Sequence, residues 1–159
     1  MTIKTADLCD EHAERVHIAD PVFHRYGGRP AFGGPITTLR VFEDNVLVRS
    51  ALEESGDGRV LVVDGAASMR CALLGDQLAA LAADNGWAGV VVNGCIRDSA
   101  DIAGIDIGVR ALATMPLKSR KLGQGERDVS LAFAGVAFEP GHYLYADEDG
   151  LLVSADALV

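Results

Sequence analysis

RVLVVDG, residues 59–65, and GVVVN, residues 89–93, are the two runs of the sequence that decide its fold. Each is a short valine-rich run that ends abruptly at a glycine or a polar residue, as strands buried on both faces do. Between them a helix is predicted from about Gly75 to a stop at Gly86. Its apolar residues recur at helical spacing: Leu74, Leu78, Leu81 and Ala82. Because parallel neighbours need a long connection, the order strand, helix, strand predicts a parallel βαβ unit.

Shorter elements precede this unit. ITTLRV, residues 36–41, predicts a strand, and DNVLVRSALEE, residues 44–54, continues into a short helix. The glycine-rich YGGRPAFGGP, residues 26–35, predicts turns in which the backbone approaches another part of the molecule closely. Near the N-terminus, Thr5 is the predicted cap of a short helix. One face of that helix would carry Leu8, Cys9, His12 and Val16.

The last third of the chain changes character. DVSLAFAGVAFEPGHYLYADEDGLLVS, residues 128–154, alternates short β runs with the turn signals AG, EPG and DEDG. This pattern predicts antiparallel hairpins and edge strands. Parallel units in the middle and hairpins at the end indicate an α/β fold with a mixed sheet. The length and the lack of any linker-like tract predict a single domain over residues 1–159.

Composition excludes several classes of function. The formal net charge of -9 argues against tracking of nucleic-acid phosphates, and the single basic cluster is short and predicts a solvated loop: Lys118, Arg120 and Lys121. No apolar run approaches the roughly 18 residues that span a bilayer, and MTIKTADLCDEHAER lacks the plan of a signal peptide, so we expect a cytoplasmic protein without a membrane partner. Three cysteines without metal spacing predict buried free thiols: Cys9, Cys71 and Cys95. The four histidines are scattered, which argues against structural zinc.

Arg97 and Asp98 follow directly on the apolar run GVVVNGCI, residues 89–96. If the strand stops at Ile96 and a turn or helix begins, both side chains can converge beyond the carboxyl end of the strand, where open parallel sheets commonly bind ligands. An arginine suits a two-pronged grip on a carboxylate, and an aspartate suits a hard cation such as Mg²⁺ or Mn²⁺. Asp101 could face the same way on a helical turn. The alternative is a surface ion pair between Arg97 and one of these acids.

The start of the predicted helix at Gly75 is a second candidate site. The first amides of a helix have no intrahelical acceptor and, with the helix dipole, favour an anion. The backbone amides of Gly75, Asp76, Gln77 and Leu78 could therefore hold a carboxylate. Alternatively, Asp76 is a first-turn acid that only complements the dipole. VLVVDGAAS, residues 60–68, follows a strand but contains neither GxGxxG nor GxxxxGK[ST], which argues against a nucleotide or S-adenosylmethionine site.

Six stretches together resemble one known family, which includes the regulator of ribonuclease activity A and the 4-hydroxy-4-methyl-2-oxoglutarate aldolases. Some of its members are labelled demethylmenaquinone methyltransferases. The stretches follow one another over nearly the whole chain: YGGRPAFGGPITTLRVFEDN, GRVLVVDGAASMRCALLGDQLA, GVVVNGCIRD, IDIGVRALATMPLKS, GERDVSLAFAGVAFEPG and YADEDGLLVS. The resemblance implies a single-domain α/β/β sandwich of the swivelling phosphohistidine-domain type, assembled as a homotrimer with sites between subunits.

The resemblance also implies roles for the candidate residues. In the aldolase branch a glycine-led helix start binds the pyruvyl group through backbone amides, which would fall on Gly75 to Leu78 here. Arg97 would bind the carboxylate of the keto acid and Asp98 a divalent metal, Mg²⁺ or Mn²⁺. The longer aldolases add an acidic residue from a C-terminal extension, for which this sequence offers no counterpart before Val159.

The implied reaction is a metal-dependent, class II aldol cleavage of 4-hydroxy-4-methyl-2-oxoglutarate into two pyruvates, with oxaloacetate decarboxylation as a secondary activity. Asp76 or Asp101 would order the water that moves the proton. The motifs contain no lysine, which argues against a Schiff base. The alternative function is a non-catalytic regulator that binds and inhibits an endoribonuclease, and methyl transfer ranks third.

Overall fold

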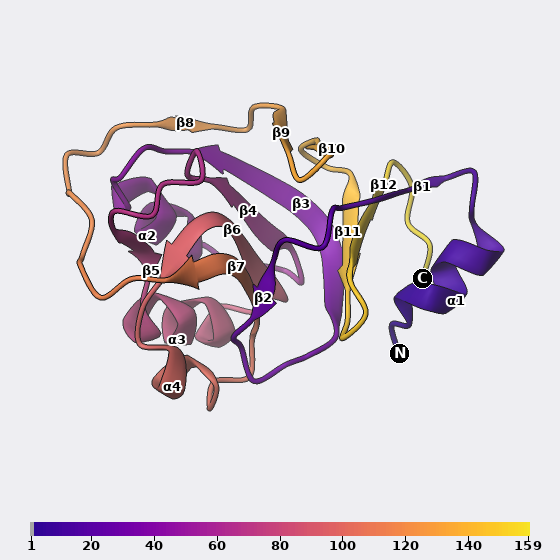
Figure 1. The fold of residues 1–159 in the computed structure, drawn as a ribbon, viewed down its shortest axis with the longest axis horizontal. Coiled ribbons are helices and arrows are strands. Elements are labelled where there is room, and N and C mark those ends of the chain that lie inside the picture. The colour runs from indigo at the N-terminus through magenta and orange to yellow at the C-terminus, as the bar shows by residue number, and fades with distance from the viewer. Residues whose placement is uncertain (1) are drawn as a thin grey trace.

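The computed structural model describes residues 2–159 and shows a mixed sheet covered by helices on one face and by β hairpins on the other (Figure 1). The helices are α1 (Thr5–Glu11), α2 (Val46–Leu52), α3 (Asp76–Asp84) and α4 (Ser99–Ile102). The strands of the first half are β1 (Val16–Ile18), β2 (His24–Arg25), β3 (Phe32–Arg40), β4 (Val60–Asp64), β5 (Ala72–Leu74) and β6 (Gly89–Ile96). Those of the second half are β7 (Gly108–Thr114), β8 (Glu126–Arg127), β9 (Leu131–Phe133), β10 (Val136–Phe138), β11 (Tyr143–Ala146) and β12 (Leu151–Ser154).

The centre of the sheet is parallel. Strands β3, β4, β6 and β7 run side by side in the same direction, and β5 pairs with the last residues of β6. Antiparallel strands extend this sheet on both sides, giving the order β1-β12-β11-β3-β4-β6-β7-β2. The predicted βαβ unit is confirmed, because β4 pairs parallel to β6 and α3 lies between them in the chain.

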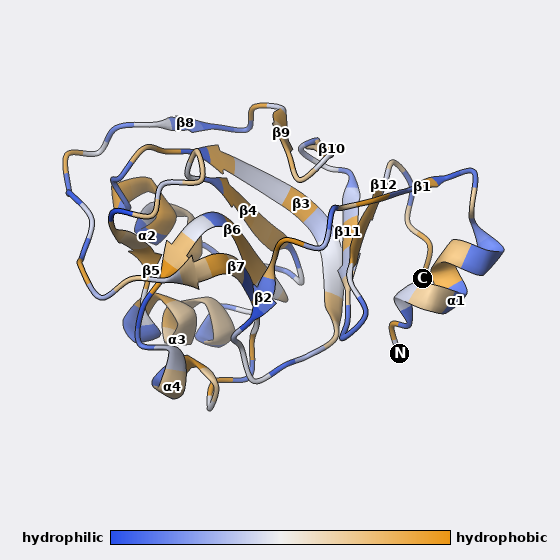
Figure 2. Ribbon diagram, in the orientation of Figure 1, coloured by the Kyte–Doolittle hydropathy of each residue, from blue (hydrophilic) through white to orange (hydrophobic). Residues whose placement is uncertain are grey.

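The sheet is buried on both faces, which explains the unbroken apolar runs. Val90 and Val92 of β6 pack into the core beneath α2, α3 and α4. Val91, between them, packs into the second core, formed with the hairpins of the last third. Alternate side chains of a strand point to opposite faces, so each run serves two cores. Figure 2 shows β4 and much of β6 in orange, whereas parts of β3 are pale. The predicted α/β class with a mixed sheet is therefore confirmed.

The C-terminal hairpins are also confirmed. Strands β9 and β10 pair antiparallel across the turn Ala134–Gly135, where both residues have positive φ, as a tight hairpin turn requires. Strands β11 and β12 pair antiparallel, and the turn between them is the predicted DEDG signal. Within residues 2–159 no helix is long and apolar enough to cross a membrane.

Helix α3 ends at Asp84, and the stop predicted at Gly86 is confirmed, because this glycine has a φ of +81°. The next residue, Trp87, is the only tryptophan of the chain and is 2% exposed. Its ring lies under the guanidinium of Arg59, with 4.6 Å between the Arg59 Cζ atom and the ring centroid, and its Nε1 donates to the carbonyl of Glu54 at 3.1 Å. Trp87 is thus buried in the core between the sheet and the helices.

The predicted capping role of Thr5 is wrong. Lys4 occupies the cap position of α1, and the Thr5 hydroxyl instead donates to Asp147 Oδ1 at 2.6 Å. The helix also ends at Glu11, so Val16 belongs to β1 and not to the helix face. The physical reason is the carboxylate of Asp147, in the β11–β12 turn. It accepts both the amide and the hydroxyl of Thr5, so this hydroxyl does not cap the helix.

Two other local predictions need correction. Strand β3 begins at Phe32, so the second glycine pair of residues 26–35, Gly33–Gly34, lies within a strand and not in a turn. A Cβ at position 34 would lie 2.0 Å from the carbonyl oxygen of Gly58, which confirms the expected close backbone approach. In the helix, Leu74 does not belong to the apolar face, because it is the last residue of β5.

Candidate active site

Arg97 and Asp98 lie where β6 stops, as the sequence predicted. The strand ends at Ile96, and Asp98 adopts the left-handed conformation, with φ 59° and ψ 38°, immediately before α4. The Arg97 amide donates to the carbonyl of Leu74 at 2.9 Å, which ties the end of β6 to the end of β5. Aspartate tolerates the left-handed region better than most residues, and such strained positions cluster at functional sites.

The sharp turn at Asp98 brings its carboxylate onto the start of α3. The Asp76 amide donates to Asp98 Oδ2 at 3.1 Å. A Cβ at Gly75 would lie 2.8 Å from that same oxygen and 3.6 Å from Arg97 Nε. An alanine at position 75 would therefore require the Asp98 carboxylate to shift. The two candidate sites of the sequence are therefore one site.

The amides at the start of α3 bind carboxylates, but these belong to the protein itself. Asp76 supplies one, because its Oδ1 accepts the amide of Gln77 at 2.9 Å. Asp98 supplies the other. Asp76 thus complements the first turn, as one of the two alternatives predicted, and the binding of a ligand carboxylate by these amides stays a prediction. A substrate carboxylate would compete with Asp98 for the Asp76 amide.

A cavity of about 160 Å³ opens over this helix start. Besides Gly75, Asp76, Gln77, Leu78, Arg97 and Asp98, its lining includes Asn45, Arg49, Ala72, Leu74, Lys118, Ser119 and Lys121. Three cationic side chains thus join Arg97 around a small polar space. Cationic groups gathered around a small cavity favour a ligand with more than one negative charge.

The solvated loop predicted for Lys118, Arg120 and Lys121 is confirmed, but the sequence did not show that its two lysines line the cavity. Both side chains are exposed, but both line the cavity. The loop reaches it because Lys118 forms a parallel bridge to Ala72, beside β5. Arg120, between the two lysines, turns away and donates to the carbonyl of Phe42 at 3.3 Å. The loop follows the carboxyl end of the parallel strand β7, on the same edge as the site. The sequence pattern did not identify β7 as a parallel strand, so the place of the lysines was missed.

Two residues at the start of α2 hold the lysine loop in place. Asn45 accepts a hydrogen bond from Lys121 Nζ at 3.0 Å and donates to the carbonyl of Leu73 at 3.3 Å. The buried Asp44 accepts the amides of Val46, Leu122 and Gln124 at 3.1, 2.8 and 3.3 Å. Burial raises the pKa of the Asp44 carboxyl, but these backbone donors outweigh burial and hold that pKa below its ordinary value.

Asp101 is the one predicted residue that does not line the cavity. It lies exposed in the first turn of α4, and its carbonyl accepts the amide of Gly104 at 3.1 Å. The remaining predicted residues, Gly75 to Leu78 with Arg97 and Asp98, all line one cavity.

The carboxylates of the cavity are the groups that could hold a divalent metal. Asp76 and Asp98 are the carboxylates of the lining, and within residues 2–159 no three His, Cys, Asp or Glu side chains are grouped to hold a metal. Mg²⁺ is usually held by one or two carboxylates and completes its shell with water and substrate oxygens. The residues therefore fit a hard cation that shares its shell with a substrate.

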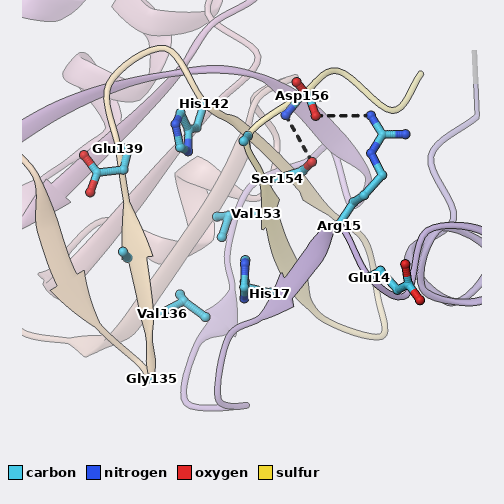
Figure 3. Close-up of a pocket in the computed structure, with 12 residues that line it drawn as sticks. Glu14, Arg15, His17, Gly135, Val136, Glu139, His142, Val153, Ser154 and Asp156 are labelled. Atoms are coloured by element: carbon cyan, nitrogen blue, oxygen red, sulfur yellow. Dashed lines mark hydrogen bonds and ion pairs between the residues drawn. The ribbon is translucent and has the colours of Figure 1, made fainter.

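A larger cavity of about 440 Å³ lies elsewhere, beside β1, β10 and β12 (Figure 3). It brings together His17 and His142, which are far apart in the sequence, with Glu139 on the same wall. Arg15 Nη2 and Asp156 Oδ2, 3.4 Å apart, pair at its rim. The arginine and aspartate of this cavity pair with each other, and no helix start lines it, so the smaller cavity is the better candidate.

The fold is α/β, and its candidate site is a small cationic cavity at the carboxyl edge of the parallel strands. The family model described as RraA-like, Aldolase/RraA, matches residues 5–153, and the chain belongs to this family. The family membership predicted from the resemblance is thus confirmed.

The individual relatives carry different functional descriptions. A protein of Alkalilimnicola ehrlichii, provisionally named a 4-hydroxy-4-methyl-2-oxoglutarate aldolase, is 59% identical over 100% of this chain and 99% of its own length. A solved structure from Thermus thermophilis, described as the RNA-processing inhibitor RraA, is 50% identical with a TM-score of 0.95, over 100% of this chain and 96% of the other. Another from Geobacillus kaustophilus, described as an S-adenosylmethionine: 2-dimethylmenaquinone methyltransferase, is 55% identical with a TM-score of 0.96, over 98% and 97%.

Proposed function

We propose that this protein is a carbon–carbon lyase that cleaves 4-hydroxy-4-methyl-2-oxoglutarate into two pyruvates with the help of Mg²⁺ or Mn²⁺. The observation that carries the proposal is the meeting of Arg97, Asp98 and the Gly75 helix start in one cationic cavity. The provisional names of the relatives support the same reaction.

The charge of the cavity suits this substrate. The molecule carries two carboxylates, one beside the keto group and one beside the hydroxyl-bearing carbon. Arg97 would hold the first, because a guanidinium binds a planar carboxylate with two parallel bonds. The second would face the lysine loop, with Lys121 held in place by Asn45. A monocarboxylate would leave part of this cationic group unmatched.

Cleavage needs a base for the C4 hydroxyl and a sink for the electrons of the broken bond. Asp76 Oδ2 is the proposed base, acting through a water, because Oδ1 is engaged by the Gln77 amide. As that proton leaves, the C3–C4 bond breaks, C4 becomes the keto carbon of one pyruvate, and C3 becomes part of the enolate of the other. A proton returned to C3 completes the second pyruvate.

The chain stabilises this enolate in two ways. Arg97, which lines the cavity, would donate to the charge as it develops, and the Asp76 amide would do so once the substrate displaces Asp98 from it. Asp98 would hold the divalent ion, which when bound supplies a Lewis acid for the keto group. Asp101, outside the cavity, would act only through water. Decarboxylation of oxaloacetate yields the same enolate by loss of CO₂, so we propose it as a secondary activity.

The proposal is tested with a coupled assay for pyruvate release, with and without EDTA. Arg97→Ala and Asp98→Asn should each lower kcat/KM by about a hundredfold or more, because each removes a group that acts on the developing charge. Asp84→Asn, at the far end of α3, and Arg120→Ala, between the two lysines, are the matched controls and should keep wild-type turnover. Wild-type activity in either site variant, or full activity in EDTA, would refute the assignment.

The structure reopens the choice between a metal and a Schiff base, because Lys118 and Lys121 line the cavity. A metal-dependent lyase should not be trapped on a lysine. Treatment with borohydride in the presence of pyruvate should therefore leave the mass of the protein unchanged. A stable adduct on either lysine would replace the metal route with an amine route.

The second candidate is a protein regulator that binds an endoribonuclease, and the likeness to the Thermus structure described as an RNA-processing inhibitor favours it. The net charge of -9 suits a basic protein partner. Inhibition of a purified endoribonuclease by the wild type and equally by Asp98→Asn would establish a regulator that works without the catalytic cavity. No inhibition and no complex in a pull-down would exclude it.

A further inference from the structure

Two arginines face each other across the β2–β7 pair, far along the sheet from the candidate active site. Arg25 and Arg110 are direct partners in the antiparallel register, so their side chains leave the same face of the sheet. Like charges in this position are destabilising unless something neutralises them. A negative charge near this pair would therefore stabilise it.

Arg110 has no carboxylate partner of its own. Its side chain is 3% exposed, and its guanidinium donates to the carbonyl oxygens of Val109, Pro30 and Asp147 at 3.2, 2.7 and 3.0 Å. All three acceptors are neutral. Burial, and next the charge of Arg25, lower the pKa of Arg110 to about 10; the charges of Asp147 and Glu148 oppose this shift, and the Phe32 ring centroid lies 5.1 Å from Arg110 Cζ.

The nearby carboxylates offset the charge of the two arginines only in part, because the pKa of Arg110 is still lowered and no carboxylate within residues 2–159 forms an ion pair with either arginine. The two carboxylate oxygens of Asp147 accept hydrogen bonds from the amide and hydroxyl of Thr5 and from the amide of Asp149, at 2.8, 2.6 and 3.0 Å. Arg25 takes part in none of the ion pairs formed within residues 2–159. Glu148 and Asp149 are exposed on the β11–β12 turn.

Both arginines line a cavity of about 490 Å³ between residues 18–25 and the β11–β12 turn. Its apolar lining is Ile18, Ala19, Pro21, Phe23 and Leu151, and its acidic lining includes Asp20, Glu148 and Asp149. Phe23 is braced edge-on against Phe133, with 6.0 Å between ring centroids. The size is typical of a small-molecule site. The cavity thus offers two cations, free carboxylates and an apolar wall.

We propose that this cavity binds a small zwitterion of the α-amino acid type with an apolar side chain. Its carboxylate lies between Arg25 and Arg110, its ammonium faces the carboxylates of the lining, and its side chain packs against Phe23. A simple anion would meet the acids, and a simple cation would meet the arginines, whereas a zwitterion satisfies both. This inference does not depend on the proposed lyase activity.

Calorimetric titration with L-phenylalanine tests the proposal, using 3-phenylpropanoate and 2-phenylethylamine as probes that lack one charge each. L-Phenylalanine should bind saturably at concentrations up to about 20 mM, and each single-charge probe should bind about tenfold more weakly or not at all. No saturable binding of L-phenylalanine, or equal binding of 3-phenylpropanoate, would overturn the proposal.

Variants locate the binding. Because Arg25 is exposed, the variant Arg25→Ala should fold. It should weaken L-phenylalanine binding about tenfold or more, because a charge-assisted hydrogen bond is lost. Arg29→Ala is the matched control: this exposed guanidinium of the same segment pairs with Asp106, 3.0 Å away, and does not line the cavity. Arg97→Ala should bind as the wild type does, which separates this site from the lyase cavity. Unchanged binding in Arg25→Ala would refute the site even if L-phenylalanine binds elsewhere.

Discussion

Asp98 and Asp147 both accept backbone amides at the start of a helix, yet they differ in how completely they are bonded. Asp147 is 9% exposed and receives Thr5 through both its amide and its hydroxyl, together with the Asp149 amide. Asp98 is exposed and receives one amide, that of Asp76, at 3.1 Å. The saturated carboxylate fastens α1 to the β11–β12 turn. The unsaturated one keeps lone pairs free for an added cation, which is what a binding site requires.

The largest expected effect comes from the glycine that lets Asp98 approach α3. In Gly75→Ala the new methyl group would lie 2.8 Å from Asp98 Oδ2 and would displace it. A displacement of about 1 Å at a reacting centre can cost about a hundredfold in rate, and kcat/KM for pyruvate release should fall by that order. Gly104→Ala is the control, because its Cβ would meet Asp101 O at an ordinary 3.6 Å. Equal activity in both variants would mean that the position of Asp98 is unimportant.

Removal of the saturated carboxylate should affect folding and not chemistry. Asp147→Ala leaves the Thr5 and Asp149 donors without their charged acceptor, and the free energy of unfolding in urea should fall by about 2 kcal/mol. Turnover per folded molecule should not change. Glu148→Ala, in the same turn but exposed, should stay within about 0.5 kcal/mol of the wild type. If Asp98→Asn destabilised the protein as much as Asp147→Ala, the contrast between the two residues would fail.

The cationic rim of the cavity, formed by Arg49, Lys118 and Lys121, should contribute less to kcat/KM than the reacting groups do. Lys121→Ala removes one charge facing the second carboxylate of the substrate, and KM should rise about tenfold with a small change in kcat. Arg120→Ala, whose side chain turns to the Phe42 carbonyl, should leave KM unchanged. An equal rise in KM for both variants would point to a diffuse field and not to a bound carboxylate.

The smallest effect is a pH dependence of stability. Burial raises the pKa of the Asp147 carboxyl, but its hydrogen bonds to Thr5 and the turn amides outweigh burial and hold that pKa below its ordinary value. The stabilisation is therefore complete above the unfolded value of about 3.9 and is lost as the pH falls through the lower folded value. Melting temperatures between about pH 5 and pH 3 should fall more steeply for the wild type than for Asp147→Asn. If the melting temperatures of the wild type and of Asp147→Asn fell equally with pH, Asp147 would have the same pKa in the folded and unfolded states.

Local patterns predicted the centre of the fold and the centre of the site. The apolar runs before Gly65 and Arg97 and the helix between Gly75 and Gly86 depend on neighbours within a few residues. The end of β6 at Ile96 then placed Arg97 and Asp98 correctly, because parallel strands share one carboxyl edge.

The remaining features depend on contacts that span the chain. Thr5 bonds to a residue 142 positions away, and Lys121 reaches Asn45 across 76 positions. Gly34 is needed in a strand because Gly58 passes against it. No local propensity encodes such partners, so the cap, the strand start at Phe32 and the cationic rim could not be predicted from the residues around them.

The single tryptophan lets the helical core be followed separately from the cluster packed beside α1. Trp87 is buried under α2 and α3 on one side of the sheet, whereas Tyr143 and Tyr145 pack with α1 beside the β11–β12 hairpin. Emission from the indole during unfolding therefore reports the helical layer, and tyrosine absorbance weights the hairpin side. Coincident transitions would show that both layers melt in one step, and separated ones would show which layer opens first.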